Sequence, residues 1–146
     1  MIADVILDDH QAVREIFAVA GNAAIEAFGE RAQEFRRFGR LWEAHAAMMD
    51  EVVYPPLAEA VGRAPAALAA RGRQREIAAR VADLAARAEA GMEEDWDTDF
   101  EELKALFERQ VDDECAVVGQ IVSRLAPGTL AEMSRRGRAI RERMAA

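Results

Sequence analysis

Five polar side chains interrupt the apolar stripes of the sequence where they could bind a metal ion or form a buried hydrogen-bond network. His10, His45, Gln74, Gln110 and Glu114 each take a place that helical spacing would give to an apolar residue. Histidine and glutamate are common ligands of transition metals. A buried carboxylate is unfavourable unless it is paired or metal-bound, so Glu114 is expected to have a partner in the core.

Apolar residues recur at three- and four-residue intervals, which predicts an all-α protein. The expected elements are a helix over 3–28 closed by Gly29, a second helix broken or kinked at Pro55 and Pro56, a third from Pro65 to Gly91, a fourth over 98–125 and a short helix over 129–146. The last two helices are expected to begin with capping boxes, Thr98 with Glu101 and Thr129 with Glu132.

Four amphipathic helices joined by short turns favour an up-down-up-down antiparallel four-helix bundle over residues 1–128. The remaining segment, 129–146, is rich in arginine and is expected to pack on the bundle or extend it. At a rise of 1.5 Å per residue, His10, His45, Gln74 and Glu114 lie at depths that agree within about 6 Å. These side chains are therefore expected to meet in one layer of the core.

The composition excludes several classes of protein. A net charge of −8 disfavours partners with phosphate backbones or anionic membrane surfaces. No apolar run approaches the roughly 20 residues of a membrane span, and the N-terminal residues lack the pattern of a signal peptide. We therefore expect a cytoplasmic protein of one domain that binds neither nucleic acid nor membrane. The single cysteine, Cys115, excludes an intrachain disulfide and is interpreted as inert.

Three stretches carry a resemblance to a known family: "LDDH" near the N-terminus, "WEAHAAMMDEVVYPPL" around His45, and "RQVDDECAV" around Glu114. Together they resemble the hemerythrin-like (HHE cation-binding) proteins over nearly the whole chain. In that family, a histidine on each helix and carboxylates four residues after the second and fourth of them hold a diiron centre. The resemblance implies metal ligation by His10, His45 and Glu114.

Half of the six ligands implied by the resemblance are replaced. The replacements are Met49 for a carboxylate and Gln74 and Gln110 for histidines, and they are expected to line the site. The remaining two histidines and one carboxylate are the ligand set of mononuclear non-haem iron proteins. We therefore expect one iron ion, with zinc or manganese less favoured, and no diiron centre. A slipped helix register would offer Asp50 as an alternative ligand.

The ligand set favours binding or sensing of O₂, NO or peroxide, and two alternatives remain. Glu114 could form a metal-free cluster with the histidines and glutamines, in a bundle that acts as a regulator or an interaction partner, for instance as a homodimer. Haem held by His10 and His45 is the second alternative. The sequence shows no nucleophile and base pair and no phosphate-binding loop, so enzymatic activity stays open.

Overall fold

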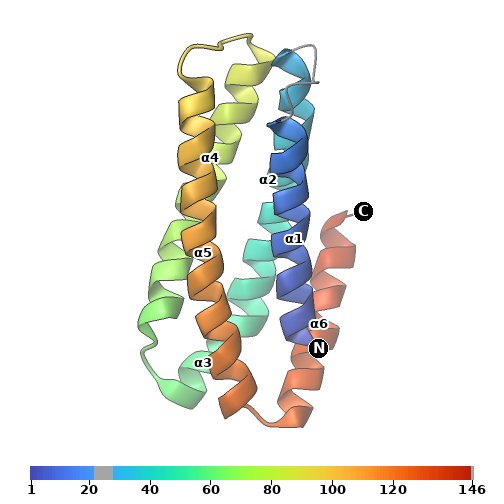
Figure 1. The fold of residues 1–146 in the computed structure, drawn as a ribbon. Helices are drawn as coiled ribbons and strands as arrows, with labels where there is room; N and C mark the ends of the chain where they lie inside the picture. The colour runs from blue at the N-terminus through green and yellow to red at the C-terminus, as the bar shows by residue number, and fades with distance from the viewer. Residues whose placement is uncertain (22–27, 146) are drawn as a thin grey trace.

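The computed structural model describes residues 1–21 and 28–145 and forms an antiparallel helical bundle (Figure 1). The helices are α1 (Ile2–Ala20), α2 (Arg31–Met48), α3 (Tyr54–Val61), α4 (Pro65–Glu89), α5 (Trp96–Arg124) and α6 (Pro127–Ala145). Helices α1, α2, α4 and α5 run up, down, up and down, and the residues described contain no strand. The expected fold class is confirmed.

Two apolar clusters fill the bundle, one above the other. The aromatic cluster, in the upper half in Figure 1, contains Phe17, Phe35, Phe38, Trp42, Trp96, Phe100 and Phe107. The aliphatic cluster, in the lower half, contains Ile2, Val5, Ile6, Met48, Met49, Val52, Leu57, Val117, Ile121, Met133 and Ile140. Along each long helix, the polar residue identified in the sequence falls between the part that packs in one cluster and the part that packs in the other.

The chain is not broken at the double proline; a π turn lies just before it. Residues Met49–Val53 form this turn between α2 and α3, and the Tyr54 N–H donates to the carbonyl of Met49. Pro55 and Pro56 have no N–H and therefore cannot continue the α-helical hydrogen-bond ladder. A π turn adds one residue and keeps the chain helical, so α2 and α3 follow each other with only a local irregularity.

The first helix ends earlier than expected. Helix α1 ends at Ala20, and the N–H of Gly21 bonds the Phe17 carbonyl; the remainder of the expected helix, residues 22–27, lies outside the described residues. The expected stop, Gly29, instead lies in a 3₁₀ turn (Phe28–Glu30) that leads directly into α2. Glycine has a low helix propensity, and a Cβ atom at Gly21 would lie only 3.1 Å from the Phe17 carbonyl oxygen.

The two expected capping boxes are wrong because both helices begin earlier. Helix α5 begins at Trp96, after Asp95 in a left-handed conformation with φ of 60°. The Trp96 indole is buried and its N–H donates to the Leu84 carbonyl at 2.9 Å, which fixes the earlier start. Helix α6 begins at Pro127, because proline is well suited to the first helical position. Thr98 and Thr129 therefore lie inside their helices.

Helix α6 turns back along the bundle and packs against α1, α2 and the π turn. Its close approach depends on Gly137, where a Cβ atom would lie 3.0 Å from Ile2 Cδ1 and 3.2 Å from Met48 Sδ. Helix α6 also contributes the apolar side chains of Met133 and Ile140 to the aliphatic cluster. The arginine-rich segment is thus an integral part of the packed structure.

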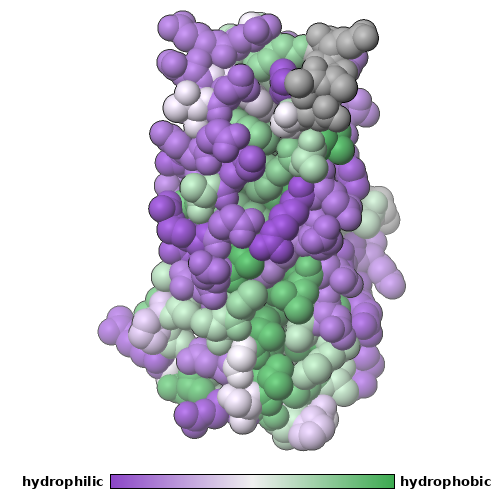
Figure 2. Space-filling view, in the orientation of Figure 1, coloured by the Kyte–Doolittle hydropathy of each residue, from purple (hydrophilic) through white to green (hydrophobic). Residues whose placement is uncertain are grey.

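On the face of the molecule seen in Figure 2, hydrophilic residues dominate much of the upper part, and apolar residues gather toward the end that carries α3. None of the described helices is long and apolar enough to cross a membrane.

Candidate metal centre

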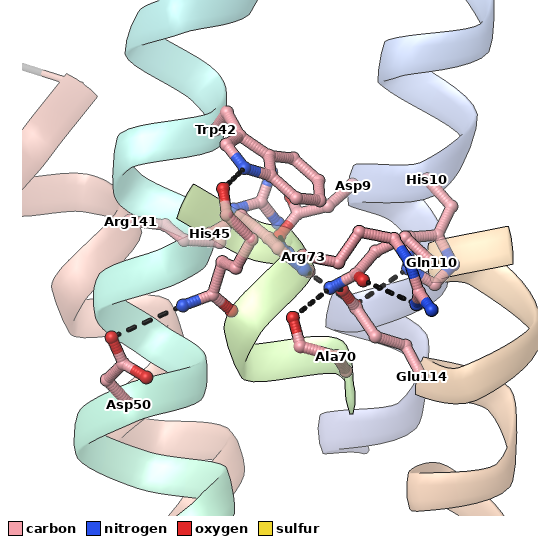
Figure 3. A network of polar contacts seen from close by, with 11 residues as sticks. Asp9, His10, Trp42, His45, Asp50, Ala70, Arg73, Gln110, Glu114 and Arg141 are labelled. Atoms are coloured by element: carbon pink, nitrogen blue, oxygen red, sulfur yellow. Dashed lines mark hydrogen bonds and ion pairs between the residues drawn. The ribbon is translucent and has the colours of Figure 1, made fainter. Parts of the chain in front are cut away.

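Three side chains meet at mid-height of the bundle, between the two apolar clusters. His10 extends from α1, His45 from α2 and Glu114 from α5, and each is at most 1% exposed. Their candidate ligand atoms all lie within 4.8 Å of one another. The structure therefore brings together the three residues that the sequence singled out, and Figure 3 shows them with their polar neighbours.

One carboxylate oxygen lies between the two imidazoles. Glu114 Oε1 is 2.9 Å from His10 Nε2 and 2.7 Å from His45 Nε2. Both Nε2 atoms thus point to the same place, where they and the carboxylate oxygen could bind one ion.

The amide of Gln110 holds the other oxygen of Glu114. Its Nε2 donates to Glu114 Oε2 at 2.8 Å and to the Ala70 carbonyl at 2.9 Å. Arg73 donates to Gln110 Oε1 at 3.2 Å, and Arg73 is itself paired with Asp113 at 2.7 Å. These contacts turn the nitrogen of Gln110 toward Glu114 and its oxygen away, so Gln110 supports the carboxylate and offers no acceptor atom to a cation there.

The other two replaced positions, Gln74 and Met49, have contacts of their own. Gln74 Nε2 donates to Asp50 Oδ2 at 3.3 Å, and Met49 is fully buried in the aliphatic cluster. Asp50, the alternative ligand, is exposed and lies 3.5 Å from Arg71 Nε. Asp50 is thus not among the residues whose candidate ligand atoms meet at the two histidines.

Two residues that the sequence analysis missed complete the network. Asp9 is 1% exposed, and His45 Nδ1 donates to its Oδ2 at 2.7 Å. Arg141, from α6, places a guanidinium nitrogen 2.7 Å from Asp9 Oδ1 (Figure 3). Asp9 carried a signal, because it lies three residues after Ile6 and four before Val13 on the buried face of α1. No sequence pattern pointed to Arg141.

Aromatic side chains fix the imidazoles from the direction of the aromatic cluster. Trp42 stacks on His45, with ring centroids 4.8 Å apart and planes at 25°, and its indole N–H donates to the Gln74 carbonyl at 2.9 Å. Phe107 meets His10 edge-on, with centroids 6.0 Å apart. The rings therefore have little freedom to rotate out of the cluster.

Comparison with known protein families gives a match over most of the chain. Residues 1–122 match the hemerythrin HHE cation-binding domain. The chain belongs to the hemerythrin family. Comparisons with curated proteins and with solved structures give no match. The family's name implies cation binding, which agrees with the cluster of His10, His45 and Glu114. The whole of α6, including Arg141, lies beyond the matched residues of this hemerythrin domain.

The charges of this hemerythrin site stabilise one another in the metal-free state. Burial by itself lowers the pKa of His45, but the charge of Glu114 and hydrogen bonds to Asp9 and Glu114 outweigh burial and raise it to about 10. Burial by itself raises the pKa of Glu114, but the charge of His45 and hydrogen bonds from both histidines lower it to about 2. His45 is therefore an imidazolium between two carboxylates when no metal is bound.

The donor set fits a metal ion. Ligand atoms on adjacent positions of an ion with bonds of about 2.1 Å lie about 3 Å apart, close to the spacing of Glu114 Oε1 from each Nε2 atom. The Asp9 carboxylate accepts from His45 Nδ1, an arrangement that fixes the ring and directs Nε2 toward a metal. His10 Nδ1 has no hydrogen-bond partner among the described residues, so His45 is the more firmly held of the two.

Cys115 follows Glu114 on α5 and takes no part in the cluster. Burial, followed by the negative charges of Glu114 and Asp112, raises the pKa of its thiol. A raised pKa disfavours the reactive thiolate, in agreement with the interpretation of this cysteine as inert.

Proposed function

We propose that this protein binds a single metal ion, preferably iron, through His10, His45 and Glu114, and uses it to bind or sense O₂, NO or peroxide. The observation that carries the proposal is the convergence of the two Nε2 atoms on one oxygen of Glu114. Two histidines and one carboxylate with open positions are typical of non-haem iron(II) sites, with zinc and manganese as competitors. A bound iron ion would supply open coordination positions and redox chemistry.

Support for one ion rather than two comes from the neighbours of the cluster. A second ion would need further donors, but Gln110 turns its nitrogen toward Glu114, Gln74 faces Asp50, and Met49 lies among apolar side chains. Support for a small ligand comes from the burial of the three ligand residues, because only a small molecule could reach atoms so enclosed.

A metal-free role is the second candidate, and one observation favours it. Asp9, Glu114, protonated His45 and Arg141 form a cluster whose formal charges cancel, so the core is electrostatically satisfied without a metal. In that case, the protein would act through its surface as a regulatory or interaction bundle. Haem between the histidines lacks support, because Glu114 Oε1 lies within 2.9 Å of both Nε2 atoms.

The deciding experiment is the metal content per chain, measured by inductively coupled plasma mass spectrometry on protein purified without a metal-affinity tag. We expect about one iron in the wild type, none in His45→Gln, and about one in the control Asp50→Asn. Circular dichroism checks that each variant is folded. Two ions per chain would overturn the mononuclear site. Loss of the metal in Asp50→Asn would overturn the assignment of the ligands. A folded wild-type protein without metal would overturn metal binding itself.

A further inference from the structure

A groove between α2 and α6 is separate from the metal centre. Its volume is about 590 Å³, within the roughly 300–1,000 Å³ of small-molecule pockets. Leu41, Ala44 and Met144 supply apolar surface to its wall. The groove therefore has room and apolar contact area for a small organic molecule.

Four arginines line this groove, two from each helix. Arg37 and Arg40 come from α2 and Arg138 and Arg141 from α6, whereas Glu142 is the single acidic residue of the lining. This concentration of positive charge stands out in a chain of net charge −8. Guanidinium groups match carboxylate and phosphate oxygens in a bidentate geometry, so the lining is suited to an anion.

Two of these arginines form ion pairs and two do not. The paired ones are Arg37, which lies 3.8 Å from Glu34, and Arg141, which is paired with Asp9. Arg40 and Arg138 are exposed, and within the described part of the chain neither forms an ion pair. Arg40 from α2 and Arg138 from α6 both line the groove, so both are available as contacts for a negatively charged head group.

Arg141 connects the groove to the metal centre. One of its nitrogens lies 2.7 Å from Asp9 Oδ1, while Asp9 Oδ2 accepts from His45 Nδ1. The Arg141 side chain is nevertheless 35% exposed. A guanidinium has five N–H donors, so Arg141 can hold Asp9 and a second anion at the same time.

We propose that the α2–α6 groove binds a small organic anion, an apolar body that carries a carboxylate or phosphate group, and that this anion shares Arg141 with Asp9. The apolar wall contacts the body, and Arg40 and Arg138 contact the charge. An anion that shares Arg141 weakens its attraction for Asp9 and so changes the electrostatic environment of His45. Occupancy of the groove is thereby coupled to the metal centre, and the coupling is reciprocal.

Binding to the groove requires no metal, so it is tested on the full-length protein treated with a chelator. Isothermal titration calorimetry compares benzoate and phenyl phosphate with inorganic phosphate and uncharged benzyl alcohol. We expect benzoate and phenyl phosphate to bind one per chain, at least tenfold more tightly than the other two. The tighter of the two identifies the preferred head group.

Two double variants test the location. Arg40→Gln with Arg138→Gln should weaken binding at least tenfold, whereas Arg124→Gln with Arg143→Gln should change it less than twofold. The control pair removes the same charge from exposed positions outside the groove. Circular dichroism verifies folding of both. The proposed site would be overturned if the two double variants lost the same affinity, or if neither benzoate nor phenyl phosphate bound. It would also be overturned if benzyl alcohol or inorganic phosphate bound as tightly as benzoate and phenyl phosphate.

The coupling has its own measurement. In protein with ¹⁵N-labelled histidine, saturating phenyl phosphate should shift the ring-nitrogen resonances of His45 in the metal-free state. Unmoved resonances would overturn the link through Arg141 and Asp9. The coupling to metal affinity rests on the proposed function, and there we expect a several-fold change in the metal dissociation constant. A protein that binds no metal would still give the calorimetric and NMR results, so the two proposals fail separately.

Discussion

Asp9 Oδ2 and His45 Nδ1 lie 2.7 Å apart in the core, and this contact joins α1 to α2 directly behind the candidate ligand atom of His45. The carboxylate keeps the proton of Nδ1 in place, so the ring can bind a metal ion through Nε2 once the ion has displaced the proton of that atom. The same carboxylate contacts Arg141, which makes it the link between the candidate metal centre and α6.

Replacing Asp9 by asparagine tests this contact. We expect Asp9→Asn to weaken metal binding by about 10- to 100-fold while one ion per chain still binds at saturation, because the ligands remain and only their orientation and basicity change. Metal competition with a chromogenic chelator measures the dissociation constant. The control is the exposed neighbour, Asp8→Asn, which should match the wild type. An unchanged affinity in Asp9→Asn would mean that His45 is not the ligand held by this contact.

Metal affinity should rise with pH. The pKa of His45 is about 10 in the metal-free protein, so at neutral pH the ion must displace a proton from its Nε2 atom. The apparent affinity is then expected to increase about tenfold per pH unit between pH 6 and 8. Calorimetry in buffers of different ionisation enthalpy should report about one proton released per ion. An affinity that does not vary over this range would show that His45 loses no proton and is not a ligand.

The metal-free protein should be most stable at mildly acidic pH. The pKa of His45 is raised from 6.5 to about 10, so its contribution to folding is complete below pH 6.5 and is lost as the pH rises through 10. The pKa of Glu114 is lowered from 4.5 to about 2, so its contribution is complete above pH 4.5 and is lost as the pH falls through 2. Urea unfolding with chelator present should therefore give a maximum between pH 4.5 and 6.5.

The variant His45→Gln serves as the control for this profile, because glutamine does not titrate. Its alkaline loss of stability should be clearly smaller than that of the wild type. If both proteins lose stability equally between pH 7 and 10, the ion pair of His45 with Asp9 and Glu114 does not stabilise the core.

Helical spacing was enough to predict the bundle and its polar layer. His10, His45 and Glu114 each lie on an apolar stripe, and the burial of such stripes brings the residues inside whatever the details of the loops. The positions of the helix ends were harder to predict. Trp96 starts α5 before Thr98 through a hydrogen bond to Leu84 on another helix, a tertiary contact that no local cap signal contains.

The partners of the polar residues could not be read from spacing. Gln74 and Gln110 occupy comparable positions on their stripes, yet one faces Asp50 and the other Glu114. Their choice depends on which neighbouring helix supplies an acceptor, and therefore on the packing of the whole bundle. Arg141 was unpredictable for the same reason, since its contact with Asp9 joins the last helix to the first.

The packing of α6 predicts a difference between two glycine-to-alanine substitutions. Alanine favours a helix by about 1 kcal/mol over glycine, so Gly119→Ala, on an exposed face of α5 with no atom within 4 Å of the new Cβ, should raise stability by about that amount. At Gly137, the Cβ would meet Ile2 Cδ1 at 3.0 Å and Met48 Sδ at 3.2 Å, and overpacking of this kind lowers stability by about 1–3 kcal/mol. Both substitutions gain this helix propensity, so the free energies of unfolding of the two variants, from urea titrations, should differ by the overpacking cost alone, about 1–3 kcal/mol in favour of Gly119→Ala. Equal values would show that α6 does not pack closely against α1 and α2 in solution, and the contact of Arg141 with Asp9 would be lost with that packing.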